Sequence, residues 1–270
     1  MRLASAFRDA RAAGETIVVP YLMVDRARLR ELGRTVAALR DGGATGLELG
    51  FPFSDPIADG PVLEAAHERA LRDRTTWIDL LAALRVASPL LPTAVMTYSN
   101  PLVHRGLDDA VGDVAAAGAT ALIVPDLSFE EVSPFQRATR HVGVALILMA
   151  APGIGSGRLA RIARSSRGFL YVVGHYGTTG GAARGATVDL RQIVRAAHRA
   201  APRLPVLIGF GVRDTRSAQS ALATGADGVV VGSALEEQLR RDPRATAVRR
   251  FLRSIARAHR LGLGRAGSSR

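Results

Sequence analysis

The chain has 270 residues, 47% of them hydrophobic, so it is long enough and apolar enough to fold around one large core. It contains no cysteine, which excludes disulfides, cysteine-ligated zinc, iron–sulfur clusters and thiol nucleophiles. It also contains no lysine, which excludes Schiff-base aldolases, covalently bound pyridoxal phosphate and a Walker-type phosphate site. These absences exclude the named site types, and we expect no cofactor and no metal.

The formal net charge of +12 raises the question of a nucleic-acid partner. The positive side chains are all arginines, spread over helical stretches such as 25–40 and 240–257, where they alternate with Ala and Leu. No basic stripe is interleaved with aromatic residues, as single-strand binding requires. We expect no nucleic-acid partner, and a positive field that favours an anionic substrate.

The segment 1–15, MRLASAFRDARAAGE, is amphipathic and predicts a helix ahead of the first strand. It lacks the apolar centre of a secretory signal, and no run in the chain approaches the ~18 apolar residues of a membrane span. We expect no membrane contact and a cytoplasmic location.

Continuous apolar, β-branched runs alternate with Ala/Leu/Arg stretches of helical period along the rest of the chain. Such runs are typical of parallel strands that are buried on both faces. The expected strands are Thr16–Val24, Thr45–Gly50, Thr93–Tyr98, Thr120–Val124, Gly143–Met149, Gly168–Val173, Pro205–Gly209 and Asp227–Val231. The expected helices include Leu29–Arg40, Trp77–Ser88, Leu107–Ala117, Phe129–His141, Leu190–Ala201 and Thr215–Thr224.

Eight strands that alternate with helices predict an α/β fold with a closed parallel barrel, the (β/α)8 or TIM barrel. An open doubly wound sheet is the alternative, but the strand count and the chain length favour the barrel. We expect one domain over residues 1–270, with an extra N-terminal helix. The end of the chain is rich in Gly, Ser and Arg, and residues 258–270 are expected to form a disordered tail.

The second predicted strand contains a carboxylate, Glu48, between two leucines. A carboxylate in an apolar strand must point into the barrel mouth or be paired, and burial would raise its pKa towards the range useful for proton transfer. The proline-stiffened loop after this strand adds Asp55 and Asp59. Either aspartate fits a turn or a helix cap, but one near Glu48 would provide a second carboxylate with a different pKa.

Glycine-rich turns follow the last two predicted strands, at Gly209-Phe210-Gly211 and at Gly232-Ser233. Barrel phosphate sites are commonly built from these two loops, with the N-terminus of a helix directed at the anion. Ordinary turn glycines are the alternative. Because two such turns occur in the expected loops, we predict a phosphate site there.

A third Gly-rich segment, Gly174–Gly181, follows the sixth strand and predicts either a mobile lid or an ordinary turn. Four aromatic residues lie in strands or at strand ends. They suit either the core or a slot for a flat hydrophobic ligand, and we name them as candidate substrate-binding residues: Tyr21, Tyr98, Tyr171 and Phe210.

The segment 47–71, LELGFPFSDPIADGPVLEAAHERAL, resembles the tryptophan synthase alpha chain family, and the resemblance extends from about Phe7 to Arg257. It implies that Glu48 is the general acid/base, that Asp59 hydrogen-bonds the indole ring nitrogen, and that Thr179 contacts Asp59 when the sixth loop closes. It also implies phosphate contacts, which fall on Gly180, Phe210, Gly211, Gly232 and Ser233.

The implied activity is that of a lyase in tryptophan biosynthesis, an aromatic amino acid pathway. It cleaves indole-3-glycerol phosphate to indole and glyceraldehyde 3-phosphate by acid–base retro-aldol chemistry. Protonation at C3 makes the indole its own electron sink, which agrees with a chain without lysine or cysteine. The implied partner is a tryptophan synthase beta chain, although a stand-alone lyase is also consistent with the sequence.

Four positions depart from the family pattern. They are the segment 21–25 in place of a Gly-Asp-Pro turn, Ser128 in place of proline, Gly174-His175-Tyr176 in place of Ser-Arg and a small residue, and Glu64 in place of glutamine. Because the departures fall on pocket or partner loops, two alternatives stay open. One is a catalytically weak regulatory subunit that binds a phosphorylated ligand and a beta-type partner. The other is a lyase for a modified indole in secondary metabolism.

Overall fold

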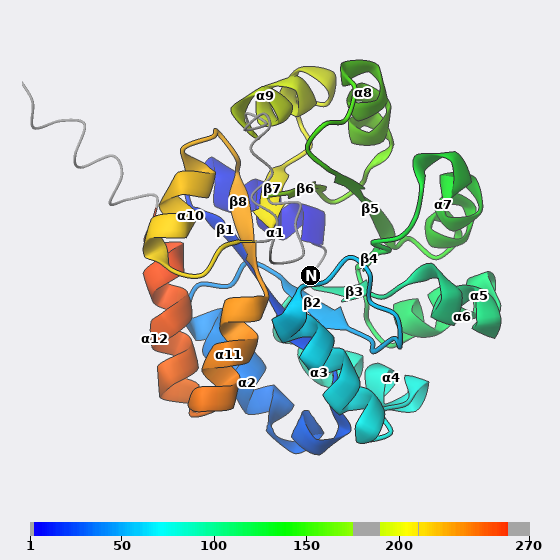
Figure 1. Ribbon diagram of the computed structural model, residues 1–270, viewed down its shortest axis with the longest axis vertical. Helices are drawn as coiled ribbons and strands as arrows, with labels where there is room; N and C mark the ends of the chain where they lie inside the picture. Colours follow the sequence, from blue (N-terminus) through cyan, green and yellow to red (C-terminus); the bar gives the residue numbers. More distant parts are fainter. Residues whose placement is uncertain (1–2, 175–189, 210, 259–270) are drawn as a thin grey trace, which may run out of the picture.

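The computed structural model describes residues 3–174, 190–209 and 211–258. The eight predicted strands are all present, each within a few residues of its expected bounds, and they form a closed parallel barrel in the order β1 to β8 (Figure 1). The strands are β1 (Ile17–Met23), β2 (Leu47–Gly50), β3 (Thr93–Met96), β4 (Ala121–Ile123), β5 (Ala145–Ala150), β6 (Leu170–Val173), β7 (Val206–Gly209) and β8 (Gly228–Val231). The predicted (β/α)8 fold is therefore confirmed.

Helix α1 (Leu3–Ala12) lies behind the barrel in the view of Figure 1, and the other helices surround the barrel. These are α2 (Leu29–Asp41), α3 (Pro61–Arg72), α4 (Trp77–Ala87), α5 (Ser99–Arg105), α6 (Leu107–Ala116), α7 (Val132–His141), α8 (Ser156–Ser165), α9 (Leu190–Ala200), α10 (Thr215–Leu222), α11 (Ser233–Arg241) and α12 (Ala245–Ala256). Short 3-10 turns, Arg26–Arg28 and Phe129–Glu131, precede α2 and α7. None of the helices described here is long and apolar enough to cross a membrane.

The barrel closes where β1 pairs with β8, in a register that places Ile17 beside Gly228. A Cβ atom on Gly228 would lie 2.2 Å from the carbonyl oxygen of Ile17, so a larger residue could not occupy this position without shifting a strand. Closure therefore depends on a residue with no side chain, as expected where two backbones approach closely.

The apolar side chains form two layers. Alternate strand residues point outward and pack with the surrounding helices, while the others, including Val19, Ala94 and Ile123, fill the barrel interior. Helix α1 lies across the interior, where Phe7 packs on Phe169 with ring centroids 5.7 Å apart. The predicted extra N-terminal helix thus closes the end of the barrel at which the strands begin, and leaves the opposite end for a site.

At the other terminus, α12 packs on α2 and leads to Ala258, which is fully buried in the outer apolar layer. The predicted tail began at this residue, but the structure places Ala258 in the core. The rest of the tail lies outside the described residues.

Candidate active site

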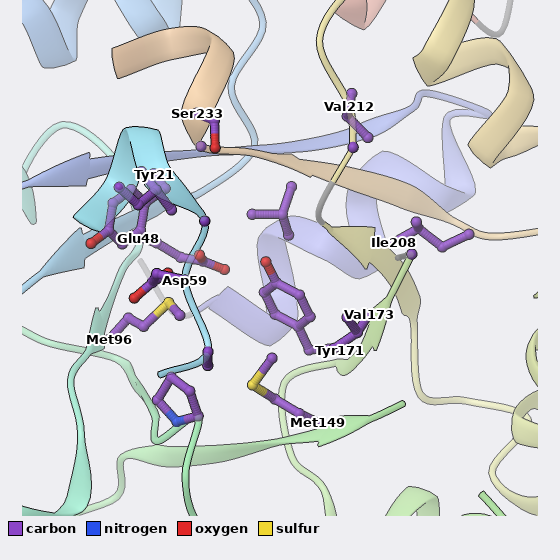
Figure 2. Close-up of a pocket in the computed structure, with 18 of the residues that line it drawn as sticks. Tyr21, Glu48, Asp59, Met96, Met149, Tyr171, Val173, Ile208, Val212 and Ser233 are labelled. Atoms are coloured by element: carbon purple, nitrogen blue, oxygen red, sulfur yellow. The ribbon is translucent and has the colours of Figure 1, made fainter. Parts of the chain in front are cut away.

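A cavity of about 1110 Å³ opens at the carboxyl ends of the strands (Figure 2). This is the end at which barrel enzymes carry their active sites. Apolar side chains from several strands line it: Met96, Met149, Val173, Ile208 and Val230. Polar groups are fewer and lie at two edges. An apolar slot with a few directed polar groups is the usual form of a small-molecule site.

Glu48 lies in the cavity wall on β2, beside Tyr21 of β1 in the strand register. Its side chain has no exposed surface, and neither carboxylate oxygen has a hydrogen-bond partner among the described residues. Burial raises the pKa of Glu48 well above its ordinary value. The residue therefore carries a proton at a pH where an exposed glutamate does not, as a general acid requires.

Two tyrosines line the cavity near Glu48, and each depends on a glycine at a strand end. A Cβ atom on Gly50 would lie 2.0 Å from the Tyr21 hydroxyl, and one on Gly209 would lie 2.2 Å from the Tyr171 hydroxyl. Burial, together with the charge of Asp59, raises the pKa of both tyrosines. Both therefore stay neutral and present flat rings, and Figure 2 shows Tyr171 across the cavity from Glu48 and Asp59.

Asp59 lies in the loop after β2 and also lines the cavity, with 4% of its surface exposed. One carboxylate oxygen, Oδ2, accepts hydrogen bonds from the Tyr98 hydroxyl at 2.9 Å and from His67 Nε2 at 3.1 Å. The other, Oδ1, is buried and has no partner among the described residues. Asp55, the other aspartate of this loop, is exposed and accepts from the Ser54 hydroxyl.

Tyr98 differs from the other two predicted tyrosines, because it does not line the cavity. It is 2% exposed, its hydroxyl accepts from the Ala58 backbone N–H at 3.0 Å, and it donates to Asp59. Burial, and the charge of Asp59, raise the pKa of Tyr98. The structure therefore places Tyr98 behind Asp59, although the sequence suggested direct contact with a substrate.

The opposite edge of the cavity carries the predicted phosphate residues that the structure describes. Gly211, Gly232 and Ser233 all line it, and Ser233 is the first residue of α11. Gly211 has φ +94°, a backbone conformation that favours glycine. The first turn of a helix presents unpaired backbone N–H groups, which suit an anion. The exposed Arg213, which the sequence analysis did not select, lines the same edge.

Three of the predicted site residues, Thr179, Gly180 and Phe210, lie outside the described residues. Gly174, the first residue of the predicted lid and the one residue of that segment that the structure describes, lines the cavity. Among residues 3–174, 190–209 and 211–258, no three His, Asp or Glu side chains are grouped so that they could hold a metal ion.

Ion pairs between two buried carboxylates and two partly exposed arginines connect the two polar edges. Arg69 of α3 donates to Asp25 at 3.1 Å and to Glu236 of α11 at 3.2 Å, and Glu236 also accepts from Arg28 at 3.1 Å. Asp25 and Glu236 are 2% and 3% exposed. Asp25 ends the segment that departs from the Gly-Asp-Pro turn, and it caps the 3-10 turn by accepting from the backbone N–H of Ala27. The helix after the Asp59 loop is therefore joined to the helix at the phosphate edge.

Comparison with known proteins gives a consistent result. The family model described as tryptophan synthase alpha chain matches residues 7–259. The chain is 41% identical to the tryptophan synthase alpha chain of Halorhodospira halophila, with 87% of this chain and 86% of that one covered. It is 37% identical to that of Trichormus variabilis, with 88% and 89% covered.

Solved structures agree with the sequence matches. A crystal structure of tryptophan synthase from M. tuberculosis superimposes with a TM-score of 0.83 at 31% identity, over 95% of this chain and 98% of that one. The alpha subunit from Legionella pneumophila gives 0.83 at 28% identity, over 96% and 98%. The fold, the matched residues and the matched length lead to one conclusion: the chain belongs to the tryptophan synthase alpha chain family.

Proposed function

We propose that the cavity cleaves indole-3-glycerol phosphate, with Glu48 as general acid/base and Asp59 as the group that binds the indole N–H. The observation that carries the proposal is the buried Glu48, whose carboxylate oxygens have no partner among the described residues, in one cavity with the unpaired Oδ1 of Asp59. The reaction is the lyase activity of the family, which yields indole and glyceraldehyde 3-phosphate.

In the first step the protonated Glu48 delivers its proton to C3 of the indole. The ring becomes an indoleninium cation, and its N–H becomes more acidic. Asp59 Oδ1 accepts that N–H and stabilises the developing positive charge. The bond between C3 and the glycerol carbon then breaks, and its electron pair returns to the ring. The glycerol hydroxyl on that carbon loses its proton to the Glu48 carboxylate, and the carbon becomes the aldehyde.

The apolar slot and the phosphate edge orient the substrate for this step. The rings of Tyr21 and Tyr171 and the side chains of Met96 and Met149 surround the indole, as their positions in Figure 2 allow. The phosphate binds at Gly211, Gly232 and Ser233, together with Gly180 and Phe210, and α11 directs the N-terminal end of its dipole at it. For Thr179, which lies outside the described residues, the family resemblance implies a hydrogen bond to Asp59.

The partner in this proposal is a tryptophan synthase beta chain, which receives the indole. The location is the cytoplasm, since a phosphorylated substrate does not cross a membrane unaided and must be used where it is made.

The test is to incubate the purified protein with indole-3-glycerol phosphate and measure indole release, alone and with a tryptophan synthase beta chain. Release in either reaction supports the proposal, and a large increase on adding the beta chain supports the partner. No release in both reactions would refute it. A parallel reaction with ring-substituted indole-3-glycerol phosphates then distinguishes a lyase for a modified indole.

A further inference from the structure

The two carboxylate oxygens of Asp59 have different surroundings. Oδ2 accepts from Tyr98 at 2.9 Å and from His67 at 3.1 Å, whereas Oδ1 is buried and has no partner among the described residues. A carboxylate that is held at one oxygen cannot rotate freely, so the direction of the other oxygen is fixed. The side chains that hold Oδ2 therefore determine the direction in which Oδ1 can accept a hydrogen bond from a ligand.

The hydrogen bonds of His67 define which ring nitrogen carries the proton. Its Nδ1 lies 3.0 Å from the backbone nitrogen of Phe53, whose N–H can only donate. Nδ1 must then be the acceptor, and the proton is on Nε2, which donates to Asp59. The ring is neutral in this arrangement, because a doubly protonated ring would direct an N–H at the N–H of Phe53.

His67 is itself held rigidly. It lies on α3, which begins at Pro61 directly after the Asp59 loop, and it is 3% exposed. Its ring contacts the edge of Tyr98, with centroids 6.1 Å apart. Two residues further along α3, Arg69 forms one ion pair with Asp25 and a second with Glu236, which joins this helix to α11. The residue that donates to Asp59 therefore lies on a helix that is also held by the ion pairs of Arg69 with Asp25 and Glu236.

We propose that His67 is a positioning residue: its Nε2–H holds Asp59 Oδ2 so that Oδ1 faces the indole N–H. This inference rests on the proposed function, because it assigns His67 a role toward the proposed ligand of Asp59. His67 does not line the cavity, so it acts through Asp59 and not on the substrate.

Two conservative variants separate the two hydrogen bonds of His67. In His67→Asn the amide oxygen reaches the place of Nδ1, so the bond from Phe53 survives and the bond to Asp59 is lost. In His67→Gln the amide nitrogen reaches the place of Nε2, so the bond to Asp59 survives and the bond from Phe53 is lost. His104→Asn, at an exposed position on α5, is the matched control.

We expect His67→Asn to lower kcat for indole release by roughly 10- to 100-fold, as expected for the loss of one hydrogen bond to a charged group. Its KM should change by less than about threefold, since the phosphate edge is untouched. His67→Gln should keep kcat within about fivefold of the unmodified chain. Unchanged kcat in His67→Asn would overturn the proposal, and so would an equal fall in both variants accompanied by an equal fall in Tm.

A spectroscopic measurement tests the same geometry without any reaction. The protein has six histidines, and ¹⁵N NMR of the labelled imidazoles, assigned with His67→Gln, identifies the tautomer of each ring. We expect a neutral, Nε2-protonated His67 at about pH 7. A charged ring or an Nδ1-protonated ring would overturn the inference. If the unmodified protein releases no indole, the proposed function fails, while this spectrum still decides the position of the His67 proton.

Discussion

The burial of Glu48 predicts a specific dependence of stability on pH. The carboxyl group has no exposed surface and no partner for either oxygen among the described residues, and its pKa is raised by desolvation. In the unfolded chain its pKa returns to about 4.3. At a pH between the two values, the folded protein holds one more proton than the unfolded chain. The stability of the unmodified protein therefore falls as pH rises through this range and levels off above the folded pKa.

Glu48→Gln removes this proton and keeps the size of the side chain. One proton of difference corresponds to about 1.36 kcal/mol for each pH unit. The free energy of unfolding of Glu48→Gln, measured relative to the unmodified protein, should therefore rise by up to about 1.4 kcal/mol per unit between about pH 5 and the folded pKa. The packing of the new amide changes the free energy of unfolding by the same amount at every pH. It does not change how the difference between the two proteins varies with pH.

Urea unfolding followed by circular dichroism at several pH values measures this difference directly. Glu31→Gln is the control, because the Glu31 side chain is 66% exposed and its removal should leave the pH dependence unchanged. Parallel curves for Glu48→Gln and the unmodified protein would show that Glu48 is ionised in the folded state, and would refute the argument that it carries the catalytic proton.

Three further substitutions test the cavity wall, the ion pairs between α3 and α11, and the predicted phosphate position. Gly209→Ala puts a Cβ atom 2.2 Å from the Tyr171 hydroxyl, so we expect a loss of about 1–3 kcal/mol of stability in urea unfolding and a raised KM for the substrate. Arg69→Met removes one ion pair from Asp25 and one from Glu236, and should cost about 1–3 kcal/mol by the same measurement, because Glu236 keeps its bonds from Arg28 and Met23. Ser233→Asp places a negative charge at the predicted phosphate position, and should raise KM by about tenfold or more with little change in Tm.

Each substitution has a control that changes the same residue type elsewhere. Gly112→Ala on α6 has no atom near the new Cβ and should be neutral or stabilising. Arg34→Met removes an exposed pair, whose Arg34 side chain is 82% exposed, and should leave stability unchanged. Ser156→Asp, at the start of α8 and outside the cavity lining, should leave KM unchanged. If a variant gives the same stability and KM as its control, the role argued for the substituted residue is wrong.

The sequence predicted the eight strands because each is a continuous apolar run between turn residues, and this pattern is local. Two of the helices that the sequence analysis did not name, α3 and α5, were obscured by local features. Helix α3 starts with Pro61 inside what reads as a proline-rich turn, and α5 spans only seven residues with Pro101 in its first turn. In both segments prolines and polar residues obscure the helical period.

Site residues could be predicted where the residue type alone indicates a function. They were harder to predict where the function depends on contacts between segments that are distant in the sequence. Glu48 was identifiable because a carboxylate in an apolar strand needs an explanation. His67 lies inside the same conspicuous segment, but its role depends on a fold that brings α3 back over the loop to Phe53 and Asp59. Tyr98 lies at a strand end like Tyr171, and only the geometry shows that it faces Asp59 instead of the cavity.

The most direct test of the account is the rate of indole release from indole-3-glycerol phosphate by Glu48→Gln beside the unmodified protein. General acid–base catalysis typically contributes about 10²–10⁴ in rate, so we predict a loss of that size with Tm maintained or raised. A Glu48→Gln protein that releases indole within about tenfold of the unmodified rate would contradict the assignment of Glu48 as the proton donor.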